Sequence, residues 1–248
     1  MPASALSTSR NLLLQTISAE DWALVEPYLD RMPLELGQVL AVPNEPIEHL
    51  CFPEGAVTSV GETLNDGSRV EIGVVGLEGM TGWPVLLGCK ISPHEAMVQV
   101  GGGSALRIET GHLLEACRRS ESLRTLLLRF VQTFSIQMGR TLASNLRDPV
   151  ERRLSRWLLM CHDRLDGDEM ELTHKFISIM LGVRRATVTD SLHILEGTGA
   201  IRGQRGRILV RDRKKLEAFA GEAYGFAEDH YGRLIAPFGK NGTFTPGS

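Results

Sequence analysis

Long apolar runs are missing from this chain of 248 residues. The longest unbroken apolar stretch covers residues 157–161, whereas a helix that crosses a bilayer needs about 18 apolar residues or more. The first ten residues also lack the basic start and apolar centre of an export signal. We therefore expect a cytoplasmic protein without a membrane span.

Closely spaced cysteines are missing as well. Cys51, Cys89, Cys117 and Cys161 form no C-x-x-C pair, which metal and iron–sulfur sites usually contain. We expect reduced, mostly buried thiols and no metal site. His49, His94 and His112 could in principle ligate a haem, but isolated loop histidines are more often simply exposed, so no cofactor is predicted.

The common catalytic motifs are also absent. No G-x-S-x-G, P-loop or H-E-x-x-H sequence occurs. The run at residues 101–103 is a triple glycine, but neither a lysine nor a helix start follows it, so we interpret it as a turn between strands. An enzyme is therefore not predicted.

Charge is distributed unevenly along the chain. Residues 1–148 carry 11 Lys/Arg against 17 Asp/Glu, a balance of −6, and residues 149–248 carry 16 against 13, a balance of +3. Within residues 173–215 the count is 10 against 3, a balance of +7. A basic segment attached to an acidic remainder is expected where only one part of a protein meets a polyanion.

Residues 32–108 are typical of an all-β sandwich or barrel. Short Val- and Ile-rich runs are separated by Gly, Pro and Asn, and we expect strands at residues 38–42, 50–52, 56–60, 70–75, 96–100 and 105–108. The sequence Asn-Asp-Gly-Ser at residues 65–68 predicts a hairpin turn. Residues 78–88 are expected to form a short helix or loop, and a short helix capped by Ser18 should precede the strands.

Residues 120–147 predict one long helix, because they contain no proline and only one glycine, Gly139. Two neighbouring apolar stripes lie on it, which indicates two packing partners, the β region and a second copy of the helix. The second stripe contains Leu128, Val131, Ser135, Met138 and Leu142. The predicted dimer interface is the first stripe, Leu123, Leu127, Phe130, Phe134 and Met138. A helix buried within a single domain remains the alternative.

The pair Asp148–Pro149 predicts a domain boundary, with Asp148 capping the next helix and Pro149 in its first turn. We expect a first domain with the β region at residues 1–119, the long helix at 120–147, and a second domain at 148–212. Residues 213–235 should form one C-terminal helix packed on the second domain, and residues 237–248 a flexible tail.

Residues 172–210 predict a winged helix-turn-helix. Thr173 can cap a first helix, Gly182 allows a tight turn, and Val188, Leu192 and Leu195 give the second helix one apolar face. Residues 201–210 form a basic, glycine-bearing hairpin. Such a unit places the start of its second helix in the major groove and its wing on phosphates.

The polar residues of this unit carry the expected DNA contacts. Arginine forks can bind guanine or phosphate, hydroxyl groups can bind phosphate oxygens, and the wing arginines supply salt-dependent attraction. The predicted DNA-binding residues are Thr173, Arg184, Arg185, Thr187, Thr189, Asp190, His193, Arg202, Arg205 and Arg207.

Residues 172–196, LTHKFISIMLGVRRATVTDSLHILE, are similar to the DNA-binding signature of the cyclic-AMP receptor protein/Fnr superfamily of bacterial transcription regulators. The order of segments also resembles that family over almost the whole chain. The resemblance implies an α+β fold with an N-terminal β-roll (a cyclic-nucleotide-binding-like jelly roll), a long dimerisation helix and a C-terminal winged helix-turn-helix. It implies a homodimer on roughly palindromic double-stranded DNA, RNA polymerase as a further partner, and an effector signal passed through the long helix.

The recognition helix departs from the family pattern. Many members begin it with Ser-Arg-Glu and place another arginine one turn later, whereas this chain has Arg184-Arg185-Ala186 and then Asp190. Arg185 falls where the base-reading arginine of the family lies. The operator should therefore differ from the familiar consensus.

The effector motif departs too. Residues 76–80, Gly-Leu-Glu-Gly-Met, resemble the start of the family's cyclic-nucleotide motif, but the Arg-Ser or Arg-Thr that should follow is replaced by His94-Glu95-Ala96. A buried phosphate facing Glu95 without a cation is disfavoured. We expect an effector other than a cyclic nucleotide. The predicted pocket residues are Gly76, Glu78, Gly79, Met80, His94, Glu95 and Ala96.

Two functions are compared on this basis. The leading hypothesis is a homodimeric DNA-binding transcription regulator. The alternative is a β-roll sensor whose winged helix binds a protein partner, and the basic wing argues against it.

Overall fold

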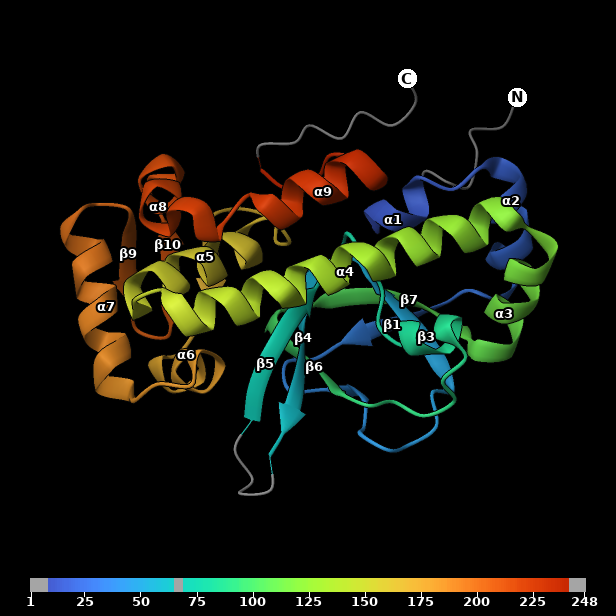
Figure 1. Cartoon of the computed structure of the whole chain (residues 1–248), viewed down its shortest axis with the longest axis horizontal. Helices are drawn as coiled ribbons and strands as arrows, with labels where there is room; N and C mark the ends of the chain where they lie inside the picture. The colour runs from blue at the N-terminus through green and yellow to red at the C-terminus, as the bar shows by residue number, and fades with distance from the viewer. Residues whose placement is uncertain (1–8, 65–68, 241–248) are drawn as a thin grey trace.

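The computed structural model describes residues 9–64 and 69–240. Its N-terminal half holds two antiparallel sheets (Figure 1). One sheet has the order β1-β7-β3 and the other β2-β6-β4-β5. The strands are β1 Asp30–Leu34, β2 Val39–Ala41, β3 His49–Pro53, β4 Ala56–Thr63, β5 Arg69–Val75, β6 Glu95–Gly101 and β7 Gly103–Glu109.

All six strands expected from the apolar runs are confirmed, and β1 is additional. Strand β1 contains Pro33, which weakens the sequence signal for a strand, but β1 lies on a sheet edge where proline is tolerated. The expected hairpin turn at residues 65–68, residues 1–8 and the last eight residues of the tail expected at 237–248 lie outside the described residues. The expectation of a flexible tail is wrong for residues 237–240, because Phe238 is buried and the Lys240 N–H is bonded to Asp163.

Short helices surround the β-roll. The cap of α2 is confirmed, since the Ser18 hydroxyl accepts a hydrogen bond from the Asp21 N–H at 3.0 Å. The segment expected to be a short helix or loop contains η3. The helical elements of this half are α1 Leu12–Gln15, α2 Ala19–Val25, η2 Glu26–Tyr28, η3 Trp83–Leu87 and α3 Thr110–Arg119.

The long helix is confirmed as α4, Glu121–Arg147, and it crosses the β-roll (Figure 1). Its 27 residues span about 40 Å. The stripe predicted to be the dimer interface faces the wrong way for that role. Leu123, Leu127, Phe130 and Phe134 are buried in the core of the same chain, and the partly buried Met138 packs against that core. The prediction is wrong because this stripe is the one that packs on the β-roll.

The junction after α4 differs from the prediction by one residue. Asp148 ends α4, donating its N–H to the Ser144 carbonyl, and Pro149 is the N-cap of the next helix without a side-chain hydrogen bond. Asp148 therefore does not cap that helix. Its carboxylate pairs with Arg152 at 3.3 Å.

The C-terminal half contains the expected helix-turn-helix and wing, together with a third strand, so that its sheet has the order β8-β10-β9. The tail after the wing folds into two α-helices rather than one. Helix α8 packs on α5, while α9 lies along α4. The elements are α5 Val150–His162, β8 Glu169–Glu171, α6 His174–Leu181, α7 Arg185–Gly197, β9 Ile201–Gln204, β10 Arg207–Val210, α8 Arg213–Ala220, η4 Gly221–Ala223 and α9 Phe226–Leu234.

One buried apolar cluster joins the two halves. Val57, Val74 and Val100 of the β-roll belong to the same buried cluster as Trp157 and Leu158 of α5. Helix α6 also lies against β5. The winged helix is thus docked on the four-stranded sheet, with its recognition helix α7 at the far end of the molecule (Figure 1).

Candidate nucleic-acid interface

The helix-turn-helix is built as its sequence predicts. The Thr173 hydroxyl accepts a hydrogen bond from the Phe176 N–H at 3.2 Å and so caps α6. Gly182 ends α6 with φ of +61°, a conformation that a side chain would disfavour. Arg184 is the N-cap of α7.

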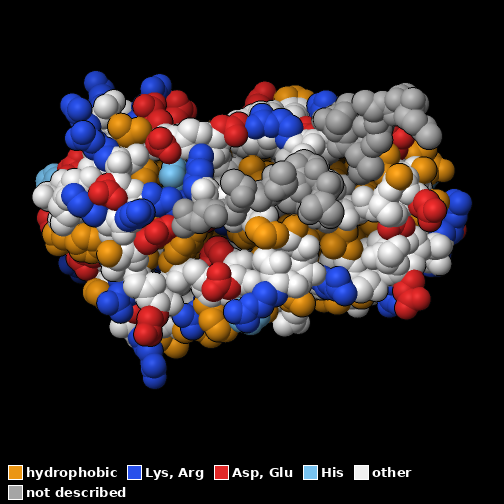
Figure 2. Space-filling model, turned by 90° about the horizontal axis from the view of Figure 1, so that it is seen from above, with side chains coloured by type: hydrophobic (Ala, Val, Ile, Leu, Met, Phe, Trp, Pro, Cys, Tyr) orange, Lys and Arg blue, Asp and Glu red, His pale blue; other side chains and the backbone are white. Residues whose placement is uncertain are grey.

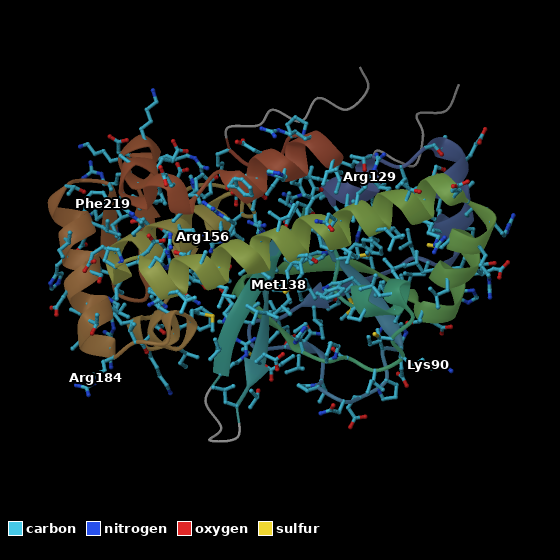
Figure 3. The ribbon with its side chains drawn as sticks, viewed as in Figure 1. Lys90, Arg129, Met138, Arg156, Arg184 and Phe219 are labelled. Atoms are coloured by element: carbon cyan, nitrogen blue, oxygen red, sulfur yellow. The ribbon has the colours of Figure 1, made fainter. Side chains whose placement is uncertain are left out.

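Helix α7 has one buried and one exposed face. Val188, Leu192 and Leu195 point into the core. The opposite face presents Arg184, Arg185, Ala186, Asp190 and His193 to solvent. Arg184 extends away from the molecule at the start of α7 (Figure 3). The first turn of the helix therefore offers two guanidinium groups to a ligand approaching that end.

The three threonine hydroxyl groups predicted to contact DNA differ in their hydrogen bonds within the protein. The Thr189 hydroxyl donates to the Arg185 carbonyl at 3.1 Å and lies 3.0 Å from His174 Nδ1. Thr173 serves as the cap of α6, whereas half-buried Thr187 has no hydrogen-bond partner for its hydroxyl among the described residues. Each hydroxyl oxygen keeps acceptor capacity. The hydroxyl hydrogens of Thr173 and Thr187 have no acceptor among the described residues.

The wing is attached to the recognition helix. The Gly203 N–H donates to Glu196 Oε1 of α7 at 2.5 Å, and a Cβ at Gly203 would lie 2.8 Å from that oxygen. A side chain at position 203 would therefore require the Glu196 carboxylate to move. Gly206 turns the hairpin with φ of +73°.

The wing arginines are not equivalent. Arg202 and Arg205 are exposed and have no ion-pair partner among the described residues. Arg207 is held by two carboxylates of β8, Glu169 at 2.8 Å and Glu171 at 3.3 Å. Its charge is therefore partly neutralised before any phosphate arrives.

One basic residue outside the predicted set belongs to the same surface. Lys175 is exposed on the first turn of α6, two residues after Thr173. The sequence indicates Lys175 only through the net positive charge of residues 173–215. Figure 2 shows Lys and Arg side chains gathered at the end of the molecule that carries the winged helix.

The predicted effector-pocket residues do not line a common hollow. Glu78 is 2% exposed and Arg164, at the end of α5, is 1% exposed. Their side chains form an ion pair of 2.8 Å. The cavity beside this pair, lined also by Phe130, Phe134 and Tyr231, has a volume of about 10 Å³. That is room for about one water molecule.

The glycines of the motif are also packed against side chains. A Cβ added at Gly79 would collide with the Phe130 ring, and one at Gly76 would lie 2.8 Å from the Arg164 side chain. Met80 is fully buried in the core of the β-roll. Burial raises the pKa of Glu78 although Arg164 opposes that shift. At Arg164 the attraction of Glu78 and other carboxylates outweighs burial and raises the pKa of the guanidinium.

The second half of the effector motif, residues 94–96, makes a different set of contacts. His94 Nδ1 is 2.6 Å from Glu62 Oε1, and the buried Ala96 lies in β6. Glu95 has a cation after all, because Arg69 Nε donates to it at 2.5 Å. Among the described residues no hydrogen bond or ion pair joins this half to Glu78. The sequence predicts that these residues line one pocket. In the structure Glu78 pairs with Arg164, while His94 and Glu95 pair with other residues.

Residues 152–219 match the family model of the Crp-like helix-turn-helix domain. No sequence among the curated proteins matches the chain. Within the part of the chain that the structure describes, no helix combines the length and the apolar character that a membrane span requires.

Several solved structures are similar in fold over most of this chain. FixK2 from Bradyrhizobium japonicum is similar with a TM-score of 0.67 at 17% identity, over 78% of this chain and 98% of that chain. A transcriptional regulator of the CRP family from Thermus thermophilus, TTHB099, has a TM-score of 0.66 at 18% identity, over 78% and 98%. CLP, a c-di-GMP responsive global regulator from Xanthomonas campestris, has a TM-score of 0.62 at 13% identity, over 78% and 99%.

These likenesses confirm the predicted fold class. The chain combines a β-sheet N-terminal domain like those that bind cyclic nucleotides, a long helix and a Crp-type helix-turn-helix.

Proposed function

We propose that this chain, whose C-terminal part is a Crp-like helix-turn-helix domain, is a homodimeric transcription regulator that binds an inverted repeat in duplex DNA. One observation carries the proposal. The exposed start of α7 presents Arg184 and Arg185, and the wing tied to α7 presents Arg202 and Arg205. Four exposed cations on these elements suit a polyanion such as DNA, and they argue against the alternative of a protein partner.

The two arginines of α7 have separate roles in this proposal. Arg185 reads a guanine through O6 and N7, which match the two parallel donors of a guanidinium. Arg184, one residue earlier, contacts phosphate. Asp190, one turn further along the exposed face, accepts from the amino group of a cytosine.

The wing supplies affinity without sequence preference. Arg202 and Arg205 neutralise phosphates and release counterions, so binding weakens as salt rises. Arg207 contributes less, because Glu169 and Glu171 already hold it. RNA polymerase, in the cytoplasm, is the further partner of such a regulator.

The dimer seam is the exposed face of α4 rather than the predicted stripe. Residues on this face follow alternating steps of three and four, the spacing of a coiled-coil seam. Leu142 and Leu146 are 62% and 77% exposed, and Ser135 and Gly139 permit close approach of a second helix. The seam consists of Thr125, Leu128, Gln132, Ser135, Gly139, Leu142 and Leu146.

A cyclic nucleotide is not proposed as the effector. The turn that carries Glu78 is filled by Arg164 and Phe130, and the space left there holds about 10 Å³. A ligand the size of a nucleotide has no room without displacing these side chains.

The first experiment is selection of random duplex DNA by the purified full chain at near-physiological salt, without an added effector. We expect an enriched inverted repeat with half-sites about one helical turn apart. Arg185→Ala should weaken binding to it by about 1–3 kcal/mol and relax one base position in each half-site. Arg119→Ala, an exposed arginine on α3, is the control and should change neither.

A second series tests the wing. Arg205→Ala should reduce the slope of log Kd against log salt by about 1, and Arg207→Ala by clearly less. Equal effects would contradict the assigned difference between the two arginines. Absence of binding to any duplex at low salt would contradict the proposal and favour the alternative, a winged helix that binds protein.

A further inference from the structure

The C-terminal segment, residues 224–240, reaches back from the winged helix to the other half of the molecule. Helix α9 lies along α4 (Figure 1). Arg129 of α4 donates to the Leu234 carbonyl at 3.4 Å, and the Arg140 guanidinium lies 4.7 Å from the centre of the Phe226 ring. This segment lies beyond residues 152–219, which match the helix-turn-helix family.

The inner side of the segment covers the buried ion pair. The Tyr231 hydroxyl donates to the Glu78 carbonyl at 2.6 Å. The Phe238 ring packs on the Tyr231 ring, with 4.6 Å between centres, and lies 5.3 Å from Arg164 Cζ. Both rings are buried. Because Glu78 belongs to the β-roll and Arg164 to the end of α5, the two rings seal the joint between the halves.

The same segment holds the end of α5 through Asp163. The Tyr224 hydroxyl donates to Asp163 Oδ2 at 2.5 Å, and the Lys240 N–H donates to Oδ1 at 3.1 Å. Arg213 of α8 completes the group with an ion pair of 2.8 Å. Both ends of the segment are therefore fixed on one buried carboxylate.

The two rings exclude water from a buried ion pair, which must then find all its hydrogen-bond partners within the protein. A buried ion pair is favourable only when both charges are well paired and their remaining hydrogen-bonding atoms are satisfied. Arg164 also donates to the Met160 carbonyl at 2.7 Å, and Glu78 accepts from the Gly76 N–H at 3.1 Å. With Tyr231 and Phe238 in place, the charges at the joint are satisfied by this chain alone.

We infer that residues 224–240 are an internal clasp, which fixes the winged helix on the β-roll and α4 without a bound ligand. Its consequence for DNA rests on the proposed function. The free protein holds α7 in a set orientation, so DNA binding does not have to supply the free energy of ordering the two halves. The clasp makes the protein competent for its operator without an effector.

Hydrogen exchange of the free, full chain tests the clasp. In Phe238→Ala, amides of residues 76–80 and 160–166 should exchange at least tenfold faster, while amides of β3 and β4 stay unchanged. Tyr231→Phe, which removes only the hydroxyl, should give a smaller rise in the same amides. Leu36→Ala is the control, since Leu36 is 64% exposed and lies outside residues 224–240.

Two exchange results would overturn the clasp. A uniform rise that includes β3 and β4 means that Phe238 contributes only global stability. No rise at residues 76–80 means that the segment does not hold the joint.

The effect of the clasp on DNA binding is measured as the Kd for a duplex selected with the unaltered protein. Phe238→Ala should raise Kd at least fivefold without changing the preferred sequence. If exchange rises locally but Kd is unchanged, the claim that the clasp prepares the protein for DNA is wrong. If exchange behaves as expected but the unaltered chain binds no duplex, the clasp stands and the proposed function fails.

Discussion

Glu71 is a buried carboxyl group that joins the two halves of the molecule. It lies in β5, and its Oε1 accepts a hydrogen bond from the Trp157 indole of α5 at 2.8 Å. Burial raises its pKa from 4.5 to about 7, although Arg69 and Arg156 oppose the shift. A single side chain between sheet and winged helix therefore changes charge near neutral pH.

The raised pKa predicts that stability falls as pH rises. Between pH 4.5 and 7 the folded chain holds a proton at Glu71 that the unfolded chain has lost. The loss sums to about 3 kcal/mol over that interval. Glu71→Gln keeps an acceptor for Trp157 and removes the ionisation, so it should be more stable than the unaltered protein at pH 8 and differ little at pH 4.5.

Urea unfolding at pH 4.5, 6 and 8, followed by circular dichroism, measures this difference. Asp229→Asn, which alters an exposed carboxylate on α9, is the control. Parallel pH profiles for the unaltered protein and Glu71→Gln would show that Glu71 does not titrate in this range.

Residue exposure in the winged helix could be predicted from the sequence, because the apolar positions of α7 recur at helical spacing and leave Arg184 and Arg185 outside. The pairing of Arg207 could not. Its partners Glu169 and Glu171 lie on β8, a three-residue strand whose register is set by the hairpin it joins. Arg164 gave no signal either, because nothing local distinguishes a buried arginine from an exposed one.

Among the elements, α4 separates two kinds of apolar residue. The first predicted stripe is buried on the β-roll. The second predicted stripe is divided, because Val131 is buried and Met138 packs against the core, whereas Ser135 and Leu142 are exposed. Which stripe meets the β-roll depends on how the helix is rotated about its axis, and that rotation is set by packing of Phe130 and Phe134 against Gly79 and Trp83.

Two substitutions should distinguish the stripes. Leu142→Arg, at an exposed seam position, should convert a dimer to a monomer while leaving the fold intact. Leu127→Ala, at a fully buried position, should lower the free energy of unfolding by about 2–5 kcal/mol and leave the dimer in place. Sedimentation velocity measures the first effect and urea unfolding the second. Reversal of the two outcomes would restore the stripe that the sequence suggested.

On the scale of the whole molecule, the order of the segments could be predicted and their docking could not. The strands, the long helix and the winged helix each have a recognisable local pattern in the sequence. No local pattern indicates that Val57 and Val74 pack with α5, or that α9 covers the joint. Such contacts depend on how complete surfaces fit, which no short window of sequence encodes.

The ion pair of Glu78 with Arg164 gives the prediction at this scale. Arg164→Met leaves a buried carboxylate without its cation and should cost about 3–5 kcal/mol of stability. Adding Glu78→Gln should recover part of that loss, because neither charge then remains. Urea unfolding of the two variants and the unaltered protein completes the comparison. A double variant less stable than Arg164→Met would mean that Glu78 is needed for another contact.

The clasp also has a consequence for the order in which the protein is made. Chains fold from the N-terminus as they are synthesised, yet the seal over Glu78 is provided by Tyr231 and Phe238, more than 150 residues later. The joint between the β-roll, α4 and α5 can therefore close only after residues 231–238 have been synthesised. A nascent chain that extends only to α8 carries every strand and helix of the winged helix on an unsealed joint, so this part of the fold is completed late in synthesis.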